Sequence, residues 1–256
     1  MTYISDIGFN DACGLDRLKT LALMSERGEF VETKAVKYLK MSVSDRLELW
    51  TKVVDGEPDG NIHAYFVGES RFPVALVEKM PRKTISLSDG AFLCRSKPCA
   101  GAGWVAGQIP FVFDAPDYHR YDDLTLPRVA VAQIMGSSRK VVAYESEEEY
   151  EEANPPDEKG YGFYAMHFLP TCFMEPRGED GELQSPMAEV SGFVIETDII
   201  TNPLTGLEFC WAQVETICGE VDVVCSPHQL EGYLHKDGVV TASCYLYGRI
   251  LRDDSN

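Results

Sequence analysis

The sequence predicts an α+β protein that is predominantly antiparallel β. Apolar and polar side chains alternate with a period of two in many short stretches, and residues 193–200 are a clear example. Turn-forming residues separate these stretches, as at Asn202-Pro203-Leu204-Thr205-Gly206. The helical patterns are few and short, and they begin at capping residues such as Asp11 and Ser146. These observations together favour strands joined by turns, with a few short helices added.

The cleanest alternation lies in residues 187–256, which we expect to form a C-terminal β domain. Its four predicted strands cover residues 193–200, 207–217, 221–225 and 239–250. A short helix over residues 228–234, started by Ser226 and Pro227, separates the third strand from the fourth. This order is similar to an OB-type barrel, which has five strands. The resemblance covers only the last quarter of the chain, and the fifth strand has to come from upstream. A small sandwich or a three-layer arrangement is the alternative.

Two further segments precede this domain. Residues 1–144 are expected to be a β-rich N-terminal domain with a helix over 11–27, closing with a hairpin whose turn is Gly136-Ser137-Ser138. Residues 145–186 combine an acidic helix over 147–153, a strand over 161–168 and a polar connecting loop.

Composition and charge restrict the possible functions. The chain has 256 residues and a net charge of −18. Residues 1–127 carry 15 Lys and Arg against 18 Asp and Glu, whereas residues 128–256 carry 8 against 23. An acidic surface repels phosphate backbones, so direct nucleic-acid binding is not expected. No apolar run is long enough to cross a membrane, and no secretory signal opens the chain. The eight irregularly spaced cysteines indicate reduced thiols and a cytoplasmic protein.

Several motifs with a chemical meaning occur, but each one lacks its structural context. Residues 101–106 (GAGWVA) fit the dinucleotide-binding pattern, yet no strand–turn–helix unit surrounds them. Cys94 and Cys99 have no second pair of ligands nearby, as a zinc site requires. The acidic run 145–152 lacks the ligand spacing of a calcium loop. We therefore expect no cofactor and no metal.

Catalytic groups are equally weak in the sequence. Ser137 and Ser138 follow a glycine in the predicted turn, and no nucleophile-elbow motif is present. His228 and His235 flank the short predicted helix, where exposed imidazoles are ordinary. No catalytic residue is identified.

The remaining candidate is one face of the C-terminal sheet. Assigning faces by odd and even positions places four rings, four carboxylates and one cation on the side opposite the small apolar residues. The members of this aromatic–acidic face are Phe209, Trp211, Tyr245, Tyr247, Arg249, Glu196, Asp198, Glu215 and Asp222. Either it is a recognition surface, or the N-terminal half or a second copy of the chain covers it.

We expect a non-enzymatic binding or assembly protein that uses this face to bind a protein or a small polar ligand, or to form a homo-oligomer. On this interpretation Trp211→Ala leaves folding intact and abolishes binding. A hydrolase with paired carboxylates on the sheet or in an interdomain cleft is the first alternative. An acidic protein that imitates nucleic acid is the second.

Overall fold

The structure is a computed structural model that describes residues 6–9, 17–81, 88–96, 109–171 and 185–251. Within this part of the chain the helices are α1 (Arg17–Arg27) and α2 (Glu147–Ala153), and the 3-10 turns named here are η3 (Tyr118–Tyr121) and η5 (Pro227–Gln229). The strands are β1 (Glu29–Glu32), β2 (Lys37–Ser42), β3 (Leu47–Val54), β4 (Glu57–Pro58), β5 (His63–Phe66), β6 (Phe72–Pro81), β7 (Gly90–Ser96), β8 (Pro110–Asp114), β9 (Arg128–Tyr144), β10 (His167–Pro170), β11 (Met187–Thr201), β12 (Glu208–Thr216), β13 (Gly219–Cys225), β14 (Leu230–Glu231) and β15 (Val239–Leu251). The predicted β-rich class is confirmed. Neither described helix has the length and apolar character needed to span a membrane.

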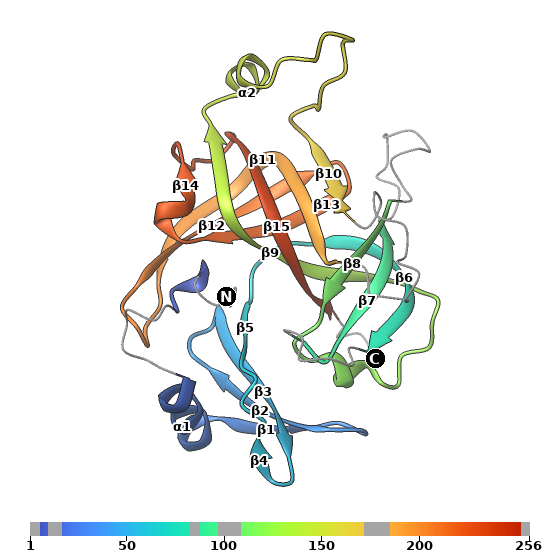
Figure 1. Cartoon of the computed structure of the whole chain (residues 1–256), viewed down its shortest axis with the longest axis vertical. Helices are drawn as coiled ribbons and strands as arrows, with labels where there is room; N and C mark the ends of the chain where they lie inside the picture. Colours follow the sequence, from blue (N-terminus) through green and yellow to red (C-terminus); the bar gives the residue numbers. More distant parts are fainter. Residues whose placement is uncertain (1–5, 10–16, 82–87, 97–108, 172–184, 252–256) are drawn as a thin grey trace.

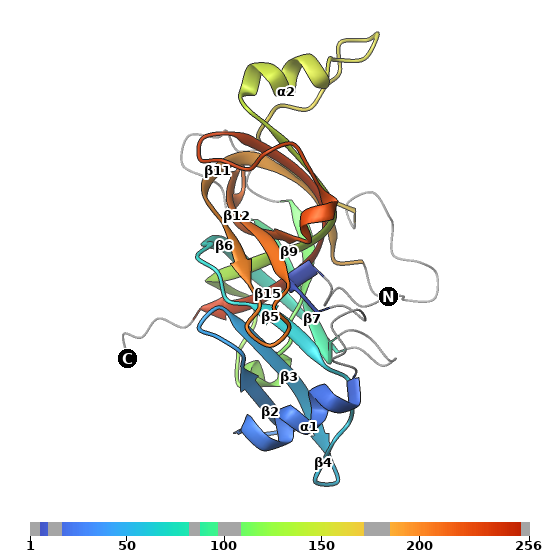
Figure 2. The same cartoon turned by 90° about the vertical axis from the view of Figure 1, so that its left-hand side faces the viewer.

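The N-terminal strands form a small antiparallel sheet. Strands β1, β2, β3 and β4 follow one another in the sheet, and β5 pairs with β3. Helix α1 packs beside β2 and buries Met24. Figures 1 and 2 both show this layer at one end of the molecule, below the larger sheet.

The larger sheet contains two closed rings of strands. In the first ring the pairing runs from β11 through β12, β13, β9 and β15 and returns to β11. In the second it runs from β6 through β7, β8, β15 and β9 and returns to β6. The long strands β9 and β15 belong to both rings and cross the middle of the molecule (Figure 1).

The predicted turn at residues 136–138 is wrong, because β9 runs without interruption from Arg128 to Tyr144. The glycine at position 136 serves close packing between strands. A Cβ atom there would lie 2.7 Å from Cys244 Sγ on β15, nearer than real Cβ contacts. The glycine and two serines that suggested a turn therefore mark the place where β9 passes another strand closely.

Two hydrophobic cores lie on opposite faces of the first ring. Cys210, Ala212 and Val214 of β12 belong to the core inside the rings. Phe209 and Trp211 of the same strand belong to a second core, which lies between the ring and the small N-terminal sheet. Alternate residues of one strand therefore serve different cores, as expected when both faces of a sheet are covered.

Three further expectations, for a helix, a strand and a domain boundary, differ from the structure. The helix predicted over residues 228–234 is a 3-10 turn followed by β14, because Leu230 pairs with Val141 of β9 and Gly232 has a φ of +88° outside the helical region. Regular strand structure near residues 161–168 begins only at His167. Strands β9 and β15, expected in separate domains, pair over most of their length.

Candidate binding surface

The predicted aromatic–acidic face lies mainly in the interior of the protein. Phe209 and Trp211 are 0% and 1% exposed, and Tyr245 and Tyr247 are also buried. The small N-terminal sheet covers them: the Phe66 ring centroid lies 5.9 Å from the ring centroids of both Phe209 and Trp211. The face is therefore covered by the N-terminal half of the chain, which is one of the arrangements that the sequence left open.

Asp222 is the buried carboxylate at the centre of this interface. Its Oδ1 accepts hydrogen bonds from Trp211 Nε1 at 2.9 Å and from the Glu69 amide at 3.2 Å. Its Oδ2 accepts from Gln133 Nε2 at 2.9 Å and from the Ser70 amide at 3.1 Å. Four donors satisfy the carboxylate in place, which is the arrangement of a structural group that holds two layers together.

Arg249 is the cation of the predicted face, and it too is committed to protein groups. Its Nη2 donates to Glu48 Oε2 at 2.6 Å, and its Nε lies 3.3 Å from Asp117 Oδ2. Burial alone would raise the pKa of Glu48, but Arg249, Trp50 and Lys40 outweigh it and hold that pKa below its ordinary value.

The other predicted carboxylates lie apart from Asp222. Glu196, Asp198 and Glu215 are exposed on β11 and β12. None of them lines the three pockets described below. These three pockets of the described residues therefore contain no acid–base pair drawn from the predicted face.

The residues of the weaker motifs also have structural partners or lie outside the described residues. Ser137 Oγ donates to Asp6 Oδ2 at 2.6 Å, and Ser138 Oγ donates to the Ser243 carbonyl at 2.9 Å. His228 lies within η5 and is exposed. Cys94 is buried, whereas Cys99 and residues 101–106 fall outside the described part of the chain. Among the described residues no group of three or more His, Cys, Asp or Glu side chains is placed to hold a metal ion.

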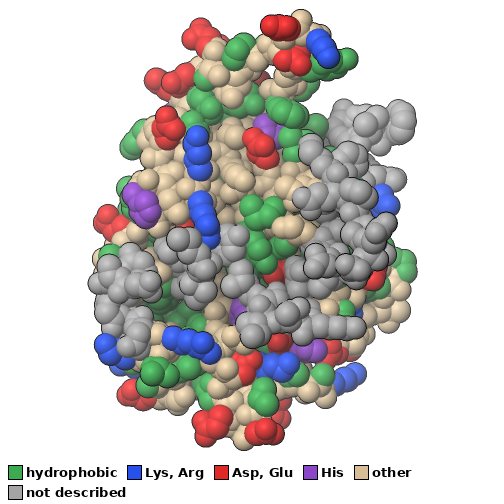
Figure 3. Space-filling view, viewed as in Figure 1, with side chains coloured by type: hydrophobic (Ala, Val, Ile, Leu, Met, Phe, Trp, Pro, Cys, Tyr) green, Lys and Arg blue, Asp and Glu red, His purple; other side chains and the backbone are tan. Residues whose placement is uncertain are grey.

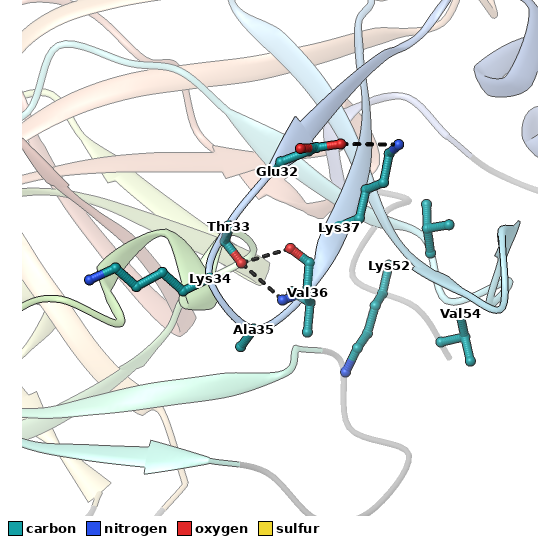
Figure 4. A pocket seen from close by; sticks show the side chains of 9 residues that line it. Glu32, Thr33, Lys34, Ala35, Val36, Lys37, Lys52 and Val54 are labelled. Carbon is teal, nitrogen blue, oxygen red and sulfur yellow. Dashed lines mark hydrogen bonds and ion pairs between the residues drawn. The ribbon is translucent and has the colours of Figure 1, made fainter.

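Two pockets adjoin the turn between β1 and β2. The first, about 350 Å³, is lined by residues 32–37 and 52–54 and carries Lys34, Lys37 and Lys52. Figure 4 shows these lysines pointing in different directions, and Lys37 is paired with Glu32 at 3.3 Å. They do not converge on one anion. The second pocket, about 490 Å³, lies between this turn and η3.

Three exposed aromatic side chains of the described residues belong to one segment, the arm, which we define as residues 145–166. Tyr161, Phe163 and Tyr164 are 74%, 58% and 82% exposed. The arm also carries eight carboxylates and a single lysine, Lys159; the acidic residues are Glu145, Glu147, Glu148, Glu149, Glu151, Glu152, Asp157 and Glu158. Figures 1 and 2 both show α2 and the segment after it rising beyond the first ring, and Figure 3 shows acidic side chains at that end.

The base of the arm is anchored although its tip is exposed. Ser146 caps α2 by accepting a hydrogen bond from the Glu149 amide at 3.3 Å. Tyr150 is buried with Ala165 and Val239, and its hydroxyl donates to the Phe163 carbonyl at 3.2 Å. His167 Nδ1 donates to the Tyr164 carbonyl at 2.8 Å. The backbone of the aromatic segment is therefore held while its three rings face solvent.

Sequence reasoning placed the acidic helix of the arm at residues 147–153, where α2 lies, but missed the exposed rings. It assigned them to a strand, where alternate rings would be buried. A signal was present: Pro155-Pro156 and the glycines at 160 and 162 break regular structure around these aromatic residues.

The chain matches no protein-family model, and neither a curated protein nor a solved structure shows a significant match to it. The fold defines a mainly β protein of the α+β class.

Proposed function

We propose that this protein is a non-enzymatic binding module whose arm docks on a basic surface of a protein partner. The observation that carries the proposal is the exposure of Tyr161, Phe163 and Tyr164 together on an anchored segment. Exposed apolar side chains gathered in one place typically mark an interaction site. Tyrosine and phenylalanine rings bury a large area at a small cost in conformational entropy, and they are frequent in such sites.

Charge decides which partner fits. Eight carboxylates against one lysine on the arm favour a surface rich in lysine and arginine. Such carboxylates steer the encounter and reject acidic surfaces, while the rings supply most of the contact energy. The partner is therefore a protein with basic side chains around an apolar patch.

The closed first ring also supports a finer description of the fold as OB-like. Strands β11, β12, β13 and β15 follow the predicted order, with the η5 turn between the third and fourth. Strand β9, from upstream, supplies the fifth strand of that ring. In OB folds the outer face of the second and third strands often binds ligand. Here the N-terminal sheet occupies that face, so we place the docking surface on the arm instead.

Photo-crosslinking tests the proposal. A benzoylphenylalanine at position 161 should capture a partner from cell extract, and the captured protein should have a basic contact surface. Capture should fall at least about tenfold in the Tyr161→Ser/Phe163→Ser/Tyr164→Ser variant assayed through a probe at position 158, since losing hot-spot rings typically costs more than 1 kcal/mol each. It should also weaken as salt rises.

The matched control is Phe30→Ser, which removes an exposed ring of β1 at the other end of the molecule. This variant should capture the partner as the unaltered protein does. Capture that is unaffected by loss of the three arm rings, or an acidic partner, contradicts the proposal. If a DNA duplex competes with this protein for the captured partner, the protein binds that partner by imitating nucleic acid. A captured second copy of this acidic chain would indicate self-assembly and would likewise contradict docking on a basic partner.

A hydrolase is the second candidate, favoured by one observation at the pocket beside η3. His119 Nδ1 lies 3.2 Å from Asp122 Oδ1, and both side chains line this pocket of about 490 Å³. A carboxylate can orient an imidazole as a general base. Assays with nitrophenyl acetate, phosphate and glycoside substrates test it: a hydrolase should show turnover that His119→Gln abolishes, and turnover unchanged in that variant excludes this pocket as the site.

A further inference from the structure

The cavity at the root of the arm brings together three segments that lie far apart in the sequence. It has a volume of about 470 Å³ and is lined by Ala143, Glu145, Glu149, Gly232, Tyr233 and His235. Ala143 belongs to the end of β9 and Glu145 directly follows that strand. Glu149 comes from α2, and the other three come from the segment after β14. The cavity is therefore a product of the tertiary structure.

Backbone contacts hold the walls of this cavity. Strand β14 pairs in parallel with Val141 and Val142 of β9, which brings the following loop against β9. Gly232 adopts a φ of +88°, and a Cβ atom there would lie 2.2 Å from the Ala143 carbonyl oxygen. Only glycine permits this approach. On the opposite wall, the Glu149 carboxylate accepts a hydrogen bond from the Glu145 amide, so that its side chain stays beside the start of α2.

The lining combines two carboxylates with a pair of stacked rings. The Tyr233 and His235 rings lie 6.3 Å apart between centroids with an interplanar angle of 22°, and Tyr233 is 77% exposed. The His235 ring is oriented by its Nδ1, which donates to the Lys236 carbonyl at 2.8 Å. None of the six lining residues is a lysine or arginine. Carboxylates beside an exposed aromatic face attract an organic cation with an apolar stem.

We propose that this cavity receives the side chain of one arginine or lysine of the partner. The cationic head lies between the Glu145 and Glu149 carboxylates, and the methylene stem lies along the Tyr233 ring. The inference rests on the proposed function, because it adds the residue-level determinant to docking by the arm. The cavity is separate from the three exposed rings, so the two parts can be tested independently.

The test uses n-butylguanidinium and n-butylammonium as probes, with n-butanol as the neutral control of similar shape. The Tyr233 and His235 ring signals are followed by NMR in the full-length protein. Both cations should give saturable shifts at these rings, and n-butanol should not. Glu145→Gln/Glu149→Gln should weaken cation binding at least about tenfold, because both charge-assisted contacts are lost. Tyr233→Leu should weaken it about 2–5-fold.

The matched control is Glu152→Gln, an exposed carboxylate of α2 outside the cavity, which should leave the titration unchanged. Equal shifts with n-butanol, or equal affinity in Glu145→Gln/Glu149→Gln when that variant retains the native spectrum, overturn the proposal. The Tyr161→Ser/Phe163→Ser/Tyr164→Ser variant should still bind the cations although it no longer captures a partner. Capture therefore reports on docking by the arm rings, whereas cation binding reports on the cavity, and either one can fail without the other.

Discussion

Arg249 of the last strand donates a hydrogen bond to Glu48 of the N-terminal sheet, with 2.6 Å between Nη2 and Oε2. This contact joins β15 to β3 across the interface that buries the aromatic face. The guanidinium also lies over the Tyr65 ring, 4.6 Å from its centroid. One cation near the C-terminus therefore helps to fasten the covering layer.

Removing the charge of Arg249 should destabilise the protein strongly. Arg249→Met leaves Glu48 and the buried Asp117 without this partner, and loss of one member of a buried pair typically costs about 3–5 kcal/mol. Adding Glu48→Met should restore part of the loss. Urea unfolding of the single and double variants measures both effects, and additive losses would contradict direct coupling of the two residues.

Acid should weaken this interface. The lowered pKa of Glu48 means that the unfolded chain binds this proton at a higher pH than the folded protein does. The stability contributed by the ionised Glu48 is complete above its ordinary pKa of 4.5 and is lost as the pH falls through the lower folded value. Glu48→Gln should therefore lose less stability than the unaltered protein between roughly pH 5 and pH 3. Urea midpoints across this range give the comparison; parallel curves would show that Glu48 does not contribute.

Trp211→Ala should destabilise the fold by about 3–5 kcal/mol, because it empties a buried site and removes a donor to Asp222. The expectation that Trp211 can be removed without loss of folding required an exposed side chain, but Trp211 is buried. Phe30→Ala, at an exposed ring, is the control and should change the free energy of unfolding by less than about 1 kcal/mol. A Trp211→Ala protein as stable as the control would contradict the buried placement.

Asp222→Asn should cost roughly 2–3 kcal/mol although the side chain keeps its size. An amide presents one oxygen and one NH2 group, whereas the native carboxylate accepts from donors on both of its oxygens. The NH2 group of the asparagine, itself a donor, must then face protein groups that are also donors. Chemical denaturation measures the loss. A matched substitution, Asp198→Asn at an exposed position, should be close to neutral.

Gly136→Ala should destabilise by about 1–3 kcal/mol through overpacking, because the added methyl group meets Cys244 Sγ. The double variant Gly136→Ala/Cys244→Ala removes that sulfur and should recover stability relative to Gly136→Ala. Thermal unfolding of the three proteins tests the close passage of β9 and β15. No recovery in the double variant would indicate a different cause.

The local features of this protein follow from its sequence. Ser146 and Glu149 define the start of α2, because capping depends on residues within one turn of each other. Alternation along β12 separates Cys210 and Ala212 from Phe209 and Trp211, since adjacent side chains of a strand point to opposite faces.

Only the tertiary structure decides what each face touches. Phe66 covers Trp211 from far along the chain, and alternation is the same whether a face meets solvent or another layer. Conversely, the rings at Tyr161 and Tyr164 resemble strand residues in sequence but have no layer over them. Burial depends on contacts between distant segments, which a local pattern does not contain. The rings of the C-terminal sheet are therefore buried, and the exposed rings that form the proposed binding site lie on the arm.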